Sequence, residues 1–172
     1  QSESVWRQAD RHGVPRLAFV NKLDRPGADL DAVAGSMRAR LGVTPLVVQR
    51  PIGTTGVVDL VRMRAVTWTD GVASEVPAAP VPADARAARQ RLEEAVAELH
   101  AGALEELGDM PDETLRTALR ELTLTGAAVV VLCGSAYRNV GVEPLLDAVV
   151  DYLPGPAGDP AADLAALLFK RT

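Results

Sequence analysis

Two short polar motifs each follow an apolar run of the kind that forms a buried β-strand. The apolar residues 15–20 lead into Asn-Lys-Leu-Asp at residues 21–24, and the apolar residues 128–133 lead into Gly-Ser-Ala at residues 134–136. The carboxyl ends of strands are the edge at which α/β sheets bind ligands. Either motif alone would be weak evidence of function, but together they match the two halves of a guanine-recognition site.

The side chains in these motifs carry the groups that guanine requires. The carboxylate of Asp24 can accept hydrogen bonds from both the N1–H and the exocyclic amine of guanine, a charge-assisted arrangement. Asn21 and the backbone N–H of Ala136 are candidate donors to the guanine O6, and the stem of Lys22 can cover the base plane. The predicted guanine-binding residues are Asn21, Lys22, Leu23, Asp24, Ser135 and Ala136.

Each motif also has an interpretation without a ligand. Residues 21–24 could form an ordinary strand-to-helix loop with an Asx turn, and Ser135 could equally be the N-cap of a helix. His12 and His100 have no partner residues at metal-ligand spacing. Surface or helix-cap roles are therefore expected for both histidines, and no metal site is predicted.

The composition predicts a folded chain without a membrane segment. Of the 172 residues, 48% are hydrophobic and 24% are charged, which argues against disorder over most of the chain. No apolar stretch is long enough to span a bilayer, and the net charge of −5 argues against a broad phosphate-binding surface. Cys133 is the one cysteine and lies in a predicted buried strand. This favours a reduced, cytoplasmic compartment and a packing role for the thiol.

The order of the predicted elements around the two motifs indicates an α/β fold. A helix ends near residue 12, and a strand at residues 14–20 follows it. An amphipathic helix is predicted up to Gly42. Its apolar stripe is Leu30, Val33, Met37 and Leu41.

From about residue 44 the sequence pattern changes from alternating strands and helices to a series of short strands. Strand-like runs are predicted at 45–52, 57–61 and 64–68, with a hairpin turn at 53–56 and a surface connection at 72–83. Helices are then predicted at 84–107, 111–122 and 142–153, and the first strand of a further domain at 164–172. The expected inner stripe of the second helix is Leu115, Ala118, Leu119 and Leu122.

The predicted helix over residues 84–107 has two opposite faces. At about 100° per residue, Leu92, Val96, Leu99, Ala103 and Leu107 fall on one side of a single straight helix. Three glutamates fall almost opposite: Glu94, Glu98 and Glu105. Any solvated helix has a charged outer face, so this charge alone does not identify a partner.

Longer stretches around the motifs resemble the G domain of elongation factor G. The resemblance is carried by residues 1–10, 14–25, 56–61, 131–147 and 165–172. It implies a cytoplasmic, ribosome-dependent GTPase that moves tRNA and mRNA and that binds GTP or GDP with Mg²⁺.

The resemblance also implies roles for particular residues. Ser135 is expected to support its loop while Ala136 contacts the base. An accessory subdomain inserted in this G domain is expected to contact the mobile stalk protein of the large ribosomal subunit. The acidic residues Glu94, Glu98 and Glu105 are the candidate contacts.

The resulting fold class is α/β, a partial P-loop GTPase-type parallel sheet with an inserted α+β subdomain. Residues 1–43 and 126–155 are expected to form the C-terminal half of the GTP-binding domain, and residues 44–125 the inserted accessory subdomain. Residues 156–172 are expected to be a linker and the start of the next domain.

No stretch of the sequence follows the phosphate-binding pattern G-x-x-x-x-G-K-S/T, and no switch threonine or catalytic histidine can be assigned. We therefore expect a piece of a larger GTPase. The chain itself is expected to contain no catalytic residue and no Mg²⁺ ligand, and to be inactive alone.

Two alternatives remain open from the sequence. The turn at 53–56 and the connection at 72–83 are shorter than is usual in the family, which is compatible with a ribosome-protection protein or another elongation factor G-like paralogue. The second alternative is an interaction module with a vestigial guanine site.

Overall fold

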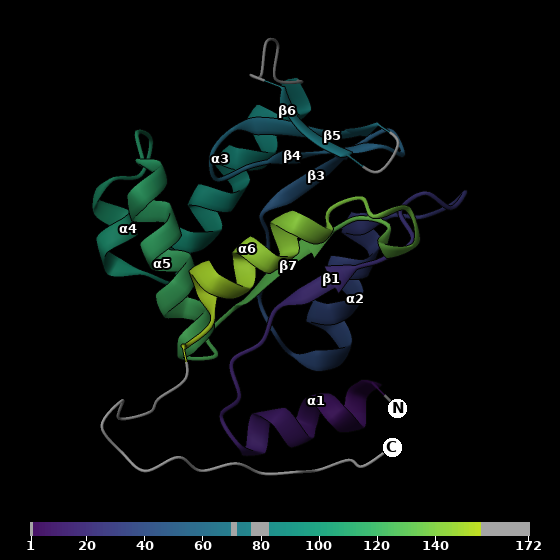
Figure 1. The fold of residues 1–172 in the computed structure, drawn as a ribbon. Helices are drawn as coiled ribbons and strands as arrows, with labels where there is room; N and C mark the ends of the chain where they lie inside the picture. The colour runs from purple at the N-terminus through teal and green to yellow at the C-terminus, as the bar shows by residue number, and fades with distance from the viewer. Residues whose placement is uncertain (1, 70–71, 77–82, 156–172) are drawn as a thin grey trace, which may run out of the picture.

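The computed structural model describes residues 2–69, 72–76 and 83–155, which form two β-sheets and the helices around them (Figure 1). In chain order the elements are α1 (Ser2–Arg11), β1 (Ala18–Val20), α2 (Leu30–Leu41), β2 (Pro45–Val47), β3 (Gln49–Ile52), β4 (Gly56–Asp59), β5 (Arg64–Thr69), β6 (Val72–Val76), α3 (Ala83–Ala97), α4 (Ala101–Glu105), α5 (Asp112–Leu124), β7 (Val129–Cys133), a 3₁₀ turn (Ala136–Arg138) and α6 (Val142–Tyr152).

The parallel sheet has the strand order β1-β7-β2, so β7 lies at its centre. All five residues of β7 are apolar and buried, as expected for a strand that is covered on both faces. Val130 and Leu132 pack into a cluster with residues of α3, α5 and α6, whereas Val129 and Val131 pack into a second cluster with residues of α2. Helices thus cover both faces of a parallel sheet, which confirms the predicted α/β class.

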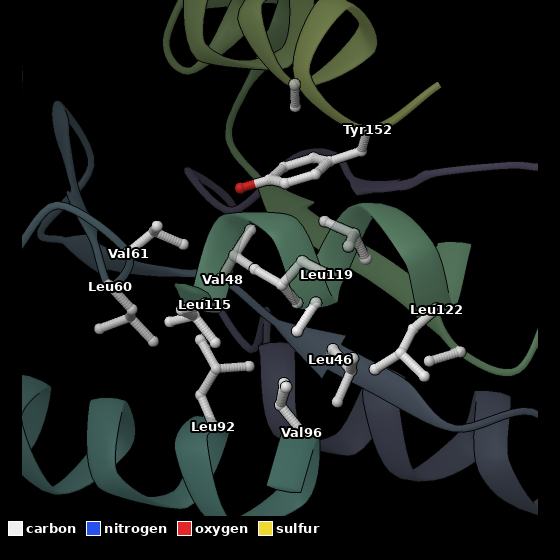
Figure 2. Close-up of a cluster of buried hydrophobic side chains, with 14 of the residues drawn as sticks. Leu46, Val48, Leu60, Val61, Leu92, Val96, Leu115, Leu119, Leu122 and Tyr152 are labelled. Atoms are coloured by element: carbon white, nitrogen blue, oxygen red, sulfur yellow. The ribbon is translucent and has the colours of Figure 1, made fainter. Parts of the chain in front are cut away.

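The first of these clusters is the larger part of the hydrophobic core. In Figure 2, side chains from α3 and α5 point toward Leu46 of β2, and the ring of Tyr152 covers the cluster from α6. Leu115 and Leu119 of α5 are fully buried, and Leu122 is nearly so. The apolar stripe predicted for this helix is therefore its buried face.

The second sheet is antiparallel, with the strand order β3-β4-β5-β6. The hairpin predicted around residues 53–56 joins β3 to β4. The prediction of a surface connection from residue 72 was wrong for Val72–Val76, because these residues form β6 and pair with β5. An edge strand is held by backbone hydrogen bonds to one neighbour, so it needs few large apolar side chains. Residues 77–82 lie outside the described residues.

The chain crosses from the parallel to the antiparallel sheet at Val48. The N–H of Val48 donates to the carbonyl of Val131 over 3.1 Å, and its own carbonyl accepts from the N–H of Leu60 over 2.9 Å. The strand-like run predicted at 45–52 is therefore two strands in two sheets. Because β2 pairs with β7, the parallel sheet takes one strand from within the range 44–125. The limits of the inserted subdomain stay a prediction.

The single helix predicted over residues 84–107 was wrong, because α3 ends at Ala97 and α4 begins at Ala101. His100 lies between them in extended backbone conformation, and its Nδ1 accepts a hydrogen bond from the N–H of Ala103 over 3.1 Å. Its Nε2 lies 3.0 Å from Oε2 of Glu121 on α5. His100 therefore caps α4, one of the two roles expected for it.

The helix predicted after the first motif is α2, and it ends at Gly42 as expected, with Gly42 in the left-handed region at φ 68°. Leu30 and Met37 of its predicted stripe are buried, but Val33 is 39% exposed. Ala34 is buried in its place. The predicted linker and strand at residues 156–172 lie outside the described residues.

Candidate guanine-recognition site

The two motifs meet at one edge of the parallel sheet. The pairing of β1 with β7 sets Val20 opposite Cys133, so both strands end at the same level. The N–H of Leu23 donates to the carbonyl of Gly134 over 3.1 Å, and the N–H of Gly134 donates to the carbonyl of Val20 over 3.0 Å. Backbone hydrogen bonds therefore fix the two loops side by side, although more than a hundred residues of chain separate them.

Asn21 joins the two loops through its side chain. Its Oδ1 accepts from the N–H of Lys22 over 2.8 Å and from the N–H of Ala136 over 3.0 Å. The sequence suggested that the N–H of Ala136 donates to the guanine O6, whereas in this structure the same N–H is bonded to Asn21. The base contacts of Asn21 and Ala136 stay predictions, and a bound O6 would have to share or replace this bond.

Lys22 and Leu23 have opposite environments. Lys22 is exposed and has a positive φ of 66°, a backbone conformation that is uncommon for residues other than glycine. Its side chain is therefore available to cover a flat ligand above the loop. Leu23 is partly buried and packs against the hydrophobic cluster that contains Val131 and Met37. Leu23 anchors the loop to the core.

Asp24 is the acidic group of the site, and its side chain is only 10% exposed. A hydrogen bond from the buried Ser135 is the largest of the effects that hold the pKa of Asp24 below its ordinary value. The backbone N–H of Asp24 and the positive charges of Arg138 and Arg25 act in the same direction, whereas partial burial raises the pKa. The carboxylate is therefore ionised at neutral pH and oriented by Ser135.

Ser135 occupies the N-cap position of the 3₁₀ turn, but its side chain makes no capping hydrogen bond. Its hydroxyl bonds to Asp24 instead. Ser135 thus holds the N-cap position, as the alternative suggested, but its side chain does not cap the turn. Ser135 was expected to support its loop. The bond from its hydroxyl connects the second motif to Asp24 of the first.

Arg138 is a member of this site that the sequence did not single out. Its Nε lies 3.3 Å from Oδ2 of Asp24, across the gap between the two loops. Arg138 is the one cation among residues 134–141, and that position was the signal available in the sequence. The pairing itself depends on how the two loops face each other.

The loop after β7 is closed by close backbone contacts. The N–H of Ser135 donates to the carbonyl of Val140 over 2.9 Å, and the N–H of Val140 donates back over 3.0 Å. A Cβ atom on Gly134 would lie 2.2 Å from the carbonyl oxygen of Val140 and 2.9 Å from Cζ of Phe19. Only glycine fits at residue 134 without displacing backbone.

Cys133 lies directly before this loop and does not take part in its chemistry. Its side chain is fully buried, and burial raises the pKa of the thiol to about 12. The thiol is therefore protonated at neutral pH and packs as a small apolar group, in agreement with the prediction.

The three glutamates suggested as partner contacts lie away from this edge. Glu94, Glu98 and Glu105 are all exposed, but the break at His100 places Glu105 on α4 rather than on α3. They therefore do not lie along one straight helix. Glu94 also accepts a hydrogen bond from Nε2 of Gln90 over 2.9 Å.

Within residues 2–69, 72–76 and 83–155, no group of three or more His, Cys, Asp or Glu side chains is arranged to hold a metal ion. We assign no ligand and no step to the Mg²⁺ that accompanies GTP in the resembling family. The helices described here are also too short or too polar to cross a membrane.

Comparison with known proteins identifies the family. The model of the elongation factor Tu GTP-binding domain matches residues 1–155. The chain belongs to this family of translational GTPase domains.

One curated relative and one solved structure specify the similarity. The chain is 61% identical, over an alignment 198 positions long, to Elongation factor G 2 of Streptomyces coelicolor, and the match covers 99% of this chain but 29% of that protein. A crystal structure of a protein from Thermus thermophilus superposes with a TM-score of 0.75 at 31% identity, covering 88% of this chain and 24% of the other. The chain thus spans less than a third of the length of each.

Proposed function

We propose that this chain is the guanine-reading part of the G domain of a ribosome-dependent translational GTPase, elongation factor G. The larger protein would bind GTP and GDP, with Mg²⁺ held by residues outside the described part. It would use GTP hydrolysis in the cytoplasm to move tRNA and mRNA through the ribosome. The 61% identity to Elongation factor G 2 supports this assignment over a ribosome-protection protein.

The observation that carries the proposal is the ionised, oriented carboxylate of Asp24 beside the Asn21–Ala136 contact. Guanine presents two adjacent N–H donors at N1 and N2, and a carboxylate accepts both in one plane. An interaction module with a vestigial site has no need for a buried Ser135 that orients this carboxylate. The geometry therefore favours a working base site.

The division of labour in the proposed GTPase follows from the same residues. Asp24 selects the base, Ser135 orients Asp24, and Lys22 covers the ring. Stabilisation of phosphoryl transfer comes from a phosphate-binding loop and switch elements, and the sequence contains no phosphate-loop pattern. We therefore expect the 172-residue chain alone to bind nucleotide weakly and not to hydrolyse GTP.

The test exchanges the hydrogen-bonding pattern of Asp24. In Asp24→Asn, the side-chain amide donates to the O2 of xanthine where the carboxylate accepted from the guanine amine. We expect guanosine binding to weaken and xanthosine binding to strengthen, changing their affinity ratio by at least about tenfold, by analogy with bidentate base readout in DNA. Chemical-shift titration of the 172-residue chain with each nucleoside measures this, because the base contacts do not require phosphates.

The matched control is Asp147→Asn, which removes one carboxylate from the exposed face of α6. It should leave both affinities unchanged. An unchanged guanosine-to-xanthosine ratio in Asp24→Asn would refute the base-reading role.

A further inference from the structure

The carboxylate that the proposed function assigns to guanine already has a partner. Nε of Arg138 lies 3.3 Å from Oδ2 of Asp24, and the two residues come from different loops. The side chain of Asp24 is 10% exposed, whereas that of Arg138 is 52% exposed. One partner is therefore held within the site, while the other reaches it from solvent.

The guanidinium of Arg138 and the edge of guanine offer the same chemistry to Asp24. Guanine carries its N1–H and its exocyclic amine on a shared carbon, which is the nitrogen–carbon–nitrogen unit of a guanidine. A guanidinium presents N–H donors in the same planar fork and adds a positive charge. Both groups would bind the same carboxylate, to which the buried Ser135 also bonds.

We propose that Arg138 is an internal competitor for guanine, which holds Asp24 when no base is bound and must leave when one binds. This inference rests on the proposed function of Asp24. The exchange keeps the nearly buried carboxylate paired in both states, so the empty site avoids an unpartnered charge. The cost falls on affinity, since each binding event must first break the ion pair.

The backbone around Arg138 indicates that only its side chain needs to move. The N–H of Arg138 donates to the carbonyl of Ser135 over 3.0 Å, and the N–H of Asn139 donates to the carbonyl of Ala136 over 3.2 Å. Asn139 ends the turn in the left-handed region at φ 57°. The guanidinium can therefore swing into solvent while Ala136 keeps its position.

The test measures guanosine affinity in the 172-residue chain and in Arg138→Met, which keeps the apolar stem and removes the donors and the charge. A partly exposed ion pair is a weak competitor, so Arg138→Met should bind guanosine roughly two- to fivefold more tightly at low salt. Guanosine is uncharged, so added NaCl should raise its affinity for the unsubstituted chain by screening the Arg138–Asp24 pair. The same salt series should leave the affinity of Arg138→Met flat.

Arg25→Met is the matched control, because Arg25 acts on Asp24 through its charge without an ion pair in the structure. It should retain the salt response of the unsubstituted chain. Arg138→Lys keeps the charge but loses the planar fork, so its guanosine affinity should lie between those of the unsubstituted chain and Arg138→Met. The carboxyl resonance of Asp24 supplies a readout without ligand, since Arg138→Met should raise the pKa of Asp24 more than Arg25→Met does.

The outcomes separate the two proposals. Equal or weaker guanosine binding by folded Arg138→Met, with an unchanged salt response, would overturn the competitor role and leave base reading intact. No guanosine binding by any of these variants, including the unsubstituted chain, would refute the base-reading function, and the competitor role would fall with it.

Discussion

The loops after β1 and β7 and the helices α3 and α4 both carry charged side chains that were suggested as functional, but only the loops bring theirs together. At the loops, Asn21 contacts Ala136 across 115 residues of sequence, and Asp24 pairs with both Ser135 and Arg138. In the helical region, Glu94 lies on α3, Glu98 in the turn that follows it and Glu105 on α4, and all three are exposed. The first region has the convergence expected of a binding site, and the second has the dispersion of a solvated surface.

The difference shows which kind of sequence spacing predicts that residues lie together in the folded structure. The loop residues follow strands whose pairing is set residue by residue, with Val20 opposite Cys133. The glutamates were aligned by assuming an unbroken helix of more than twenty residues, and one cap at His100 ended that alignment. Predicting that two motifs at a sheet edge lie together therefore needs fewer assumptions than predicting that distant residues share one face of a long helix.

The largest expected effect comes from breaking the loop after β7 with Gly134→Ala. The added Cβ would lie 2.2 Å from the carbonyl oxygen of Val140, which is backbone and cannot yield cheaply. We expect the free energy of unfolding to fall by about 3 kcal/mol and guanosine binding to be lost. Urea denaturation and nucleoside titration measure the two effects.

Gly35→Ala controls for the loss of a glycine as such. Gly35 lies within α2, and a Cβ there would meet no atom within 4 Å. This variant should be more stable than the unsubstituted chain by about 0.5–1 kcal/mol. A Gly134→Ala chain of unchanged stability and affinity would show that the loop geometry is not what positions the site.

The next largest effect tests what holds α3 in place, apart from its glutamates. Arg89 on α3 is 9% exposed and donates to the carbonyls of Leu60, Val61 and Met110. Arg89→Met keeps the stem but leaves these carbonyls without their donor. We expect the free energy of unfolding to fall by about 2 kcal/mol, with guanosine affinity unchanged, when both are measured as above.

Arg91→Met, an exposed position on the same helix, should change stability by less than about 0.5 kcal/mol. If Arg89→Met were equally mild, the buried hydrogen bonds of α3 would be dispensable. If it also lost guanosine binding, the two regions would not be independent, and the contrast between them would fail.

The smallest effect is expected from reversing Glu94, Glu98 and Glu105 to Lys. All three are exposed, so stability should change by less than about 0.5 kcal/mol. If they steer a basic ribosomal partner such as the proposed stalk protein, ribosome-stimulated GTP turnover of the larger protein should slow, more at low salt than at high salt, with GTP affinity unchanged.

Separate variants sharpen this test. Because α3 and α4 are distinct, reversal of the Glu94–Glu98 pair and reversal of Glu105 should have separable effects rather than the effect of one continuous ridge. Asp147→Lys on α6 is the control for added positive charge. If ribosomes stimulate GTP turnover equally for all variants across the salt series, these glutamates are solvated surface residues without a steering role.

The predictable part of this molecule followed from patterns that act over a few residues. The buried run of β7, the cap of α2 at Gly42 and the buried stripe of α5 each depend on local spacing, and each appears in the structure. The edge strand β6 was missed because its pairing with β5 uses backbone groups that every sequence has. His100 was expected in a cap or surface role. That it begins a new helix inside the predicted one, with its Nε2 3.0 Å from Glu121 of α5, was not expected from local spacing.

That the two motifs lie at one edge of the sheet was predictable from the sequence, but the contacts between them were not. Strand ends identify Asn21, Asp24 and Ala136 because loops of this type must end parallel strands. The pairing of Arg138 with Asp24 and the bond from the N–H of Ala136 to Asn21 depend on the side-chain rotamers and on how the two loops face each other. Sequence spacing contains no information on that choice.

The crossing at Val48 has a mechanical consequence. The neighbouring Gln49 is buried, and its Oε1 accepts a hydrogen bond from the N–H of Cys133 over 3.1 Å, one residue before Gly134. Val48 itself is hydrogen-bonded to Val131 of the same strand. These two hydrogen bonds join the start of the antiparallel sheet to the end of β7. A displacement of β3 would therefore act directly on β7 just before the loop at Gly134.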